Sequence, residues 1–373
     1  MVDGELFDKL CEIGRTIRNN GRPWGGIQLV VTGDFFQLPP VPDGQTRTAK
    51  FAFDAATWGT SIPHTIGLTQ VFRQRDPQFA QMLNEMRLGK ISDDTVRAFR
   101  ALTRPLRFDD GIETTELFPT RLEVERSNSK RLNDLPGRSY RYDAVDTGDA
   151  NIKDKLLQNM MAPKSMELKV GAQVMLIKNI DEQLVNGTIG KVKQFMTQNE
   201  WECGGLGETT EDGPIDLEKA VKKIKKFQNN QDITKTLIEF PIVEFLCTDG
   251  SRRTLQCVYD EWKVELPNGD VQAKRSQLPL ILAWALSIHK AQGQTLERVK
   301  VDLTRIFEKG QAYVALSRAT SQQGLQVLKF DKSKVMAHPK VVGFYNRLYS
   351  AEQALGGNNK PAGQQTIQSM FGS

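Results

Sequence analysis

The stretch Ile27-Gln28-Leu29-Val30-Val31-Thr32-Gly33-Asp34 decides the fold class that this sequence predicts. Its first five residues are almost all apolar, which is typical of a strand buried on both faces of a sheet. A helix is expected before it, over residues 5–18, because apolar residues recur there every three or four positions: Leu6, Leu10, Ile13 and Ile17. A helix followed by a buried strand indicates an α/β sheet, whose ligands bind at the carboxyl ends of the strands. Gly33, Asp34 and Gln37 are therefore candidate binding residues.

The next segments continue the helical and strand pattern. Asp76 and Pro77 form a cap and first turn, which predicts a helix whose apolar stripe is Phe79, Met82, Leu83 and Met86. A second helix is expected to start near Ser92, and a strand over residues 116–121 leads into a polar helix over residues 122–135.

From about Leu168 the pattern changes to short strands separated by glycine turns. The predicted strands cover residues 173–178, 188–190, 238–246, 253–259 and 264 onward, with turns at Asn186-Gly187 and Asn268-Gly269. Continuous apolar segments return at residues 278–286 and 299–303. The sequence therefore predicts an α/β domain that resumes after an inserted small β-barrel.

Composition excludes several classes of protein. The chain has 373 residues, 39% of them hydrophobic and 25% charged, which is typical of a globular protein of two or three domains. A net charge of +5 is compatible with a polyanionic partner. The 4 cysteines have no paired or zinc-binding spacing, which favours a reducing compartment. No apolar run is long enough for a membrane span, and Met1-Val2-Asp3-Gly4-Glu5 does not resemble a targeting signal.

Two further stretches carry residues suited to phosphate chemistry: Ser287–Thr295, which contains His289, Lys290 and Gly293, and Gly310–Arg318. Arginine provides a planar fork for the charge that develops on a transferred phosphoryl group, and Arg73 and Arg318 both follow apolar segments. Gln37 lies in a loop stiffened by two prolines, where its amide could contact a terminal phosphate or attacking water. No G-x-x-x-x-G-K-[ST] phosphate loop occurs in the sequence.

Five stretches in this order resemble the third to sixth motifs of the Pif (petite integration frequency) family of DNA helicases. They are V-T-G-D-F-F-Q-L-P-P-V from Val31, L-T-Q-V-F-R-Q from Leu68, L-F-P-T-R from Leu117, A-L-S-I-H-K-A-Q-G-Q-T-L from Ala285 and Y-V-A-L-S-R from Tyr313. Residues 8–18 also resemble the signature helix that distinguishes this family from its RecD-like relatives. The resemblance covers residues 1–348 and implies a RecA-like helicase fold.

The resemblance also implies roles for single residues. Gln37 would sense the γ-phosphate, while Arg73 and Arg318 would be arginine fingers; Gly33, Asp34 and Gly293 would also lie at the nucleotide. His289 and Lys290 would link the nucleotide state to single-stranded DNA, and Thr120 and Arg121 would contact the DNA backbone. The implied cofactors are ATP and Mg²⁺, the implied partners are single-stranded and forked DNA, and no metal ligand of this chain is identified.

The implied activity is ATP-dependent 5′-to-3′ translocation that unwinds forks, G-quadruplexes and RNA–DNA hybrids in DNA repair, recombination and telomere maintenance. The implied compartment is the nucleus or the mitochondrion, and a monomer is expected. Family members carry the phosphate loop and the Mg²⁺-binding Asp-Glu pair upstream of the segment found here. We therefore expect the chain to be a C-terminal portion of a helicase, inactive by itself. The alternative is an ATP-incompetent module that binds single-stranded DNA or tethers a clamp.

The expected domains follow from these readings. Residues 1–75 would end the first RecA-like domain, residues 76–167 and 277–350 would form the second, residues 168–276 the inserted barrel, and residues 351–373 a disordered tail. A lysine-rich helix is expected over residues 217–226, either as a solvated face or as a contact to phosphates. The tail resembles a sliding-clamp-binding box, and the alternative is a polar disordered end. The residues of that box are Gln364, Ile367, Met370 and Phe371.

Overall fold

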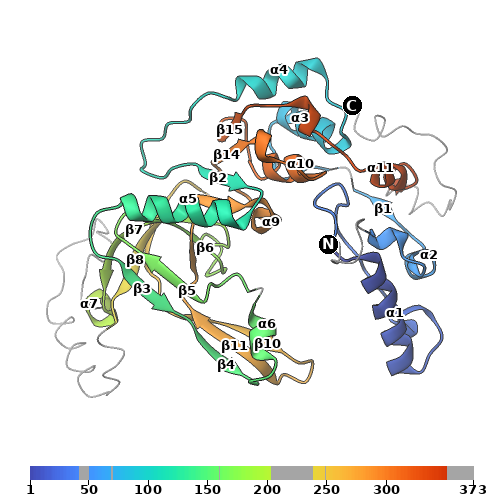
Figure 1. Cartoon of the computed structure of the whole chain (residues 1–373), viewed down its shortest axis with the longest axis horizontal. Helices are drawn as coiled ribbons and strands as arrows, with labels where there is room; N and C mark the ends of the chain where they lie inside the picture. Colours follow the sequence, from blue (N-terminus) through green and yellow to red (C-terminus); the bar gives the residue numbers. More distant parts are fainter. Residues whose placement is uncertain (42–49, 69, 159, 203–237, 248, 351–373) are drawn as a thin grey trace. The chain divides into compact units, whose positions relative to one another are not determined.

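The structure is a computed structural model that describes residues 1–41, 50–68, 70–158, 160–202, 238–247 and 249–350 (Figure 1). Contacts divide the chain into two compact units. Unit 1 contains residues 1–106, 117–120 and 287–373, and unit 2 contains residues 107–116 and 121–286. Unit 2 is therefore inserted in the sequence of unit 1. None of the helices in the described ranges is long and apolar enough to span a membrane.

Helix α1 (Gly4–Arg18) confirms the helix predicted over residues 5–18, and it begins where the Asp3 carboxylate accepts hydrogen bonds from two backbone N–H groups. The face that it buries differs from the predicted stripe. Phe7 and Cys11 are buried, and the Phe7 ring packs against Trp24 and Trp58 with centroid distances of 5.2 and 5.3 Å. The stripe that periodicity selected is exposed instead: Leu6, Leu10, Ile13 and Ile17.

The strand predicted over residues 27–31 is wrong. In the described part of the chain no strand pairs with this segment, and Val30 and Val31 are 90% and 53% exposed. Leu29 is half-buried against the small cluster of Phe7, Ala52 and Ala55. A strand requires a neighbour to accept and donate its backbone hydrogen bonds, so an apolar run without such a neighbour stays extended and unpaired.

The helices predicted after residue 76 are confirmed. Helix α3 (Pro77–Leu88) is capped by Asp76, whose side chain accepts from the N–H of Gln78, and helix α4 (Asp93–Ala101) is capped by Ser92. The predicted stripe of α3 is buried: Phe79, Met82, Leu83 and Met86. Unit 1 also contains the following short elements: α2 (Trp58–Ser61), β1 (Ile66–Gly67), α9 (Ile288–Ala291), α10 (Gln311–Leu316), α11 (Pro339–Tyr345) and β16 (Tyr349–Ser350).

A four-stranded sheet has the order β13-β2-β14-β15. Its strands are β13 (Ala285–Ser287), β2 (Thr115–Phe118), β14 (Val299–Asp302) and β15 (Leu325–Leu328), and β14 pairs with β15 in parallel. The single strand predicted over residues 278–286 is wrong, because the segment is divided between β12 (Leu280–Leu282) and β13, which belong to different sheets. Between them the Ala283 N–H donates to the Gln173 carbonyl, where the chain leaves one sheet for the other.

Unit 2 contains antiparallel sheets, and the small β-barrel over residues 168–276 stays a prediction. Its five-stranded sheet has the order β12-β6-β7-β8-β9, with β6 (Gln173–Leu176), β7 (Ile189–Met196), β8 (Phe240–Leu246) and β9 (Arg252–Gln256). Its smaller sheets are β10 (Asp260–Glu265), β11 (Val271–Gln277) and β4 (Val145–Gly148), and β3 (Tyr140–Asp143) with β5 (Ser165–Leu168). Its helices are α5 (Arg121–Asp134), α6 (Lys153–Leu157) and α7 (Gln198–Glu202).

The predicted turn at Asn268-Gly269 is confirmed: it joins β10 and β11, and Gly269 has a φ of 89°. The lysine-rich helix predicted over residues 217–226 lies outside the described residues.

Candidate functional site

Arg318 is a buried cation at the end of α10. Its side chain is 2% exposed, and it donates from Nε to the Val314 carbonyl at 2.9 Å and from Nη1 to the Gln294 carbonyl at 3.3 Å. Among the residues that the structure describes, no carboxylate forms an ion pair with it. Burial and the positive charge of Arg73 lower the pKa of Arg318 to about 10, so it stays protonated at neutral pH. A buried guanidinium that lacks a bound counter-charge is suited to an anionic ligand.

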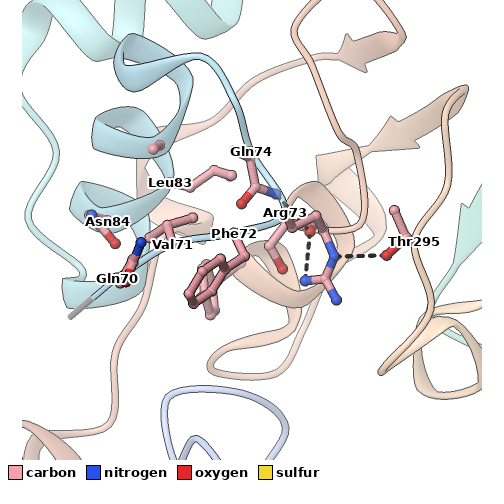
Figure 2. A pocket seen from close by; sticks show the side chains of 11 residues that line it. Gln70, Val71, Phe72, Arg73, Gln74, Leu83, Asn84 and Thr295 are labelled. Atoms are coloured by element: carbon pink, nitrogen blue, oxygen red, sulfur yellow. Dashed lines mark hydrogen bonds between the residues drawn. The ribbon is translucent and has the colours of Figure 1, made fainter. Parts of the chain in front are cut away.

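Arg73 lies beside Arg318 and is held by the same part of the chain. Its Nε donates to the Thr295 hydroxyl at 3.1 Å, although the two residues are 222 positions apart, and its Nη1 donates to the Ser317 carbonyl at 3.4 Å (Figure 2). The buried amide of Gln74 donates to the carbonyls of Ser317 and Ala319 at 3.2 and 2.9 Å. The segment that carries Arg73 is thus fixed to the turn after α10, and two guanidinium groups of like charge are kept close together.

A cavity of about 540 Å³ adjoins Arg73 (Figure 2). That volume is in the range of small-molecule sites. Its lining includes Gln70, Val71, Phe72, Arg73, Gln74, Leu83, Asn84, Thr295, Tyr313 and Ser317. Phe72 is 80% exposed, so its ring presents a flat apolar face, while Arg73 and Thr295 supply cationic and hydroxyl groups. The cavity therefore combines groups for a planar aromatic ligand with groups for an anion.

Gln37 lies in a loop that approaches α10 closely. Its Oε1 accepts a hydrogen bond from Nε2 of Gln292 at 3.0 Å. A Cβ at Gly310 would lie 2.5 and 2.6 Å from the carbonyl oxygens of Phe36 and Gln37, and the φ of Gly310 is 78°. Only glycine allows this conformation together with this approach. The structure thus brings the segments of Gln37, Gly293, Arg73 and Arg318 together in unit 1.

The other predicted ligand residues of the 33–37 loop have different surroundings. Gly33 is exposed, whereas the Asp34 carboxylate accepts hydrogen bonds from Arg87 and Tyr345. Asp34 therefore has protein donors as partners and is not a free carboxylate. Gly293 has a φ of 85° and lies in the open turn after α9.

The predicted DNA-contacting residues are exposed at element ends. His289 and Lys290 lie on α9, Thr120 ends the segment after β2, and Arg121 is the first residue of α5. Thr120 belongs to unit 1 and Arg121 to unit 2. The predicted clamp-binding residues Gln364, Ile367, Met370 and Phe371 lie outside the described residues.

The described residues contain no cluster of metal-ligating side chains. Among them no group of three or more His, Cys, Asp or Glu side chains could hold a metal ion, and the carboxylate of Asp34 accepts hydrogen bonds from Arg87.

Four residues of this site were not predicted from the sequence: Phe72, Thr295, Tyr313 and Arg87. Phe72 and Thr295 lie inside or beside the quoted motifs, so their position next to Arg73 and Gly293 was an available signal. Tyr313 is largely enclosed, and burial raises the pKa of its phenol. Nothing local marked Arg87, because its role depends on contacts with distant residues.

Comparisons with known proteins show the family of this chain. Residues 1–97 match the model of the PIF1-like helicase, and residues 151–195 match the 2B domain of the DNA helicase Pif1. The crystal structure of the Pif1 helicase from Candida albicans aligns with a TM-score of 0.70 and 47% identity, over 92% of this chain and 74% of that one. This chain belongs to the Pif1 family of DNA helicases.

Curated members of the Pif1 family are similar along nearly the whole chain. The ATP-dependent DNA helicase PIF1 of Emericella nidulans is 58% identical over 98% of this chain and 51% of its own length. The protein of the same name from Saccharomyces cerevisiae (strain YJM789) is 42% identical over 95% of this chain and 50% of its own length. The chain therefore spans about half the length of these relatives. The predicted fold class is confirmed as the RecA-like helicase fold, an α/β structure with a parallel strand pair and separate antiparallel sheets.

Proposed function

We propose that this chain supplies the arginine-bearing part of an ATP-dependent 5′-to-3′ DNA helicase. The observation that carries the proposal is the pair Arg73 and Arg318 in a chain of the Pif1 family. These two adjacent guanidinium groups have no carboxylate partner among the described residues, and Arg73 lines a cavity. The terminal phosphate of ATP gains negative charge during transfer, and arginine forks stabilise that charge.

The remaining residues of the site have complementary roles in this proposal. Gln37 orients the attacking water or the terminal phosphate, because its amide lies in the loop that Gly310 holds against α10. The exposed ring of Phe72 stacks on the nucleotide base. A Bacteroides Pif1 helicase, whose fold this chain shares at 22% identity with a TM-score of 0.57, was crystallised with ADP-AlF3 and single-stranded DNA.

DNA contact is proposed for His289, Lys290, Thr120 and Arg121, which are exposed at the ends of α9, β2 and α5. Backbone phosphates supply most of the sequence-independent affinity for single strands, and aromatic stacking adds to it. Single-stranded and forked DNA are thus the proposed partners, with genome maintenance in the nucleus or mitochondrion as the proposed setting and G-quadruplexes and RNA–DNA hybrids as proposed substrates.

The test uses a chimera in which the part of the Emericella nidulans relative that this chain does not span is joined before residue 1. We expect DNA-stimulated ATP hydrolysis, and Arg73→Ala should lower kcat by about 10³-fold or more while single-stranded DNA still binds. Arg104→Ala is the matched control, since Arg104 also donates to backbone carbonyls, those of Gln322 and Leu325, but does not line the cavity. Near-normal turnover of Arg73→Ala would remove the arginine-finger role.

The alternative proposal for residues 1–373 is a module that binds single-stranded DNA without hydrolysing ATP. Filter binding of an oligonucleotide together with an ATPase assay of residues 1–373 tests the module, which is refuted by hydrolysis by the chain alone or by a lack of binding. Binding without hydrolysis is expected for both functions, and DNA-stimulated ATP hydrolysis by the chimera then favours the helicase.

The clamp-binding box is a separate proposal that rests only on residues 364–371 of the sequence. Met370 occupies the place of the first aromatic residue, which predicts reduced affinity. A peptide of residues 360–373 should bind the sliding clamp at high micromolar concentration, and the Phe371→Ala peptide should not. No binding by either peptide would remove this proposal.

A further inference from the structure

An enclosed ion pair joins the loop of Gln37 to α3. Arg87, in the last turn of α3, donates from Nε to Oδ2 of Asp34 at 3.1 Å and from Nη2 to Oδ1 at 2.9 Å. The two side chains are only 14% and 18% exposed. The guanidinium carbon of Arg87 also lies 4.4 Å from the centre of the Phe36 ring and 4.9 Å from the centre of the Tyr345 ring. Arg87 is thus held by a bidentate ion pair and two aromatic faces.

The Asp34 carboxylate accepts hydrogen bonds from three protein residues. Besides Arg87, its Oδ1 accepts from the Tyr345 hydroxyl at 3.0 Å and from the Phe36 N–H at 3.1 Å. The Tyr345 oxygen in turn accepts from the Phe35 N–H at 3.1 Å. Burial by itself would lower the pKa of Arg87, but the charge and hydrogen bonds of Asp34 raise it, so Arg87 stays protonated. Three consecutive loop residues are therefore bonded to one network.

This network acts on the same loop that Gly310 supports from α10. The turn closes when the Gln37 N–H donates to the Asp34 carbonyl at 3.1 Å, which links the backbone of Gln37 directly to the ion pair. The charge of Asp34 also raises the pKa of Arg318, against the larger effects of burial and Arg73, so Asp34 and Arg318 share one electrostatic environment. α3, which carries Arg87, begins shortly after Arg73 in the sequence.

We propose that Asp34, Arg87 and Tyr345 are positioning residues that fix the 33–37 loop so that Gln37 is held in place for catalysis, an inference that rests on the proposed function. A buried ion pair contributes little net stability, because desolvation offsets its attraction. A bidentate guanidinium–carboxylate pair between two rings does restrict orientation strongly. The conformation of the loop, and with it the direction of the Gln37 amide, is what the network determines.

The first arm of the test measures hydrogen exchange of the peptide covering residues 33–40 in the chain itself. Tyr345→Phe keeps the ring over Arg87 but removes the acceptor of the Phe35 N–H, and Arg87→Lys keeps the charge but removes the bidentate geometry. We expect both variants to exchange about 10- to 100-fold faster in this peptide, with α1 and unit 2 unchanged. Arg97→Lys is the control, because Arg97 pairs with Asp94 on the exposed face of α4. Unchanged exchange in both variants would overturn the proposal.

The second arm measures ATP hydrolysis in the chimera described above. A positioning role predicts that Tyr345→Phe lowers kcat by about tenfold while the KM for ATP changes less than about twofold. Faster loop exchange with normal kcat would overturn the catalytic part of the inference. A wild-type chimera without any turnover would instead refute the proposed function, and the exchange arm would still show whether the network fixes the loop.

Discussion

Replacing Arg318 with methionine tests whether Arg318 binds an anion or is a structural buried arginine. The pKa of Arg318 is lowered from 12.5 to about 10, which corresponds to ~3 kcal/mol against its charged form in the folded chain. Because the folded-state pKa is about 10, this cost is present at every lower pH. Methionine removes the charge and fills a similar space.

Removing the charge of Arg318 favours folding, and the hydrogen bonds lost in Arg318→Met offset only part of this gain in folding free energy. Val314 keeps a donor for its carbonyl, the Ser317 hydroxyl at 3.2 Å, so the main unsatisfied group is the Gln294 carbonyl. An unsatisfied buried acceptor costs about 1–3 kcal/mol. We therefore expect the free energy of unfolding of Arg318→Met to lie within about 1–2 kcal/mol of the wild-type value.

Arg275 in unit 2 is the matched control. It is also buried, but it pairs with Asp146 through bonds of 2.8 and 2.7 Å, and those bonds raise its pKa. Arg275→Met leaves the Asp146 carboxylate without its cation and should cost about 3–5 kcal/mol. Native-state hydrogen exchange measures both variants, since it reports α10 and β11 separately. A loss of more than about 3 kcal/mol in Arg318→Met would refute the reasoning and make Arg318 a structural residue.

Three further predictions concern other parts of the site. Gly310→Ala should destabilise α10 by at least about 1 kcal/mol in native-state hydrogen exchange, because its Cβ would meet the carbonyl oxygens of Phe36 and Gln37 at 2.5 and 2.6 Å. Gly343→Ala in α11 is the control, since open space surrounds that position, and equal destabilisation by both variants would contradict the prediction. The free energy of unfolding should fall as the pH drops below about 6.5, because burial lowers the pKa of His338 and the unfolded chain therefore binds the proton at a higher pH than the folded chain. His338→Asn retains a side-chain acceptor for the Lys340 N–H, and urea unfolding of this variant should show a weaker pH dependence of the free energy of unfolding in this range. Lys290→Ala should reduce the salt dependence of single-strand binding by a slope of about 0.7 in a log–log plot of affinity against salt, and an unchanged slope would exclude a phosphate contact.

Local interactions explain the elements that were predictable. The caps Asp76 and Ser92 and the apolar stripe of α3 lie within a few residues of the helices they define, so sequence alone identified both helices. The hairpin at Asn268-Gly269 was predictable for the same reason, since its turn requires a positive φ. The order of the motifs likewise identified the family, together with Arg73, Arg318 and Gln37 as the residues to examine.

Only the tertiary structure decided which groups meet. An apolar run at residues 27–31 predicted a strand, but a strand depends on a partner elsewhere in the chain, and no described segment pairs with it. The apolar stripe of α1 predicted from periodicity is exposed, because Trp24 and Trp58 pack on the face of the helix that carries Phe7. The pairing of Asp34 with Arg87 and Tyr345, and of Arg73 with Thr295, joins residues from 53 to 311 positions apart. Sequence determines such contacts only through the complete fold, because local spacing carries no information about which distant side chains share a small buried space.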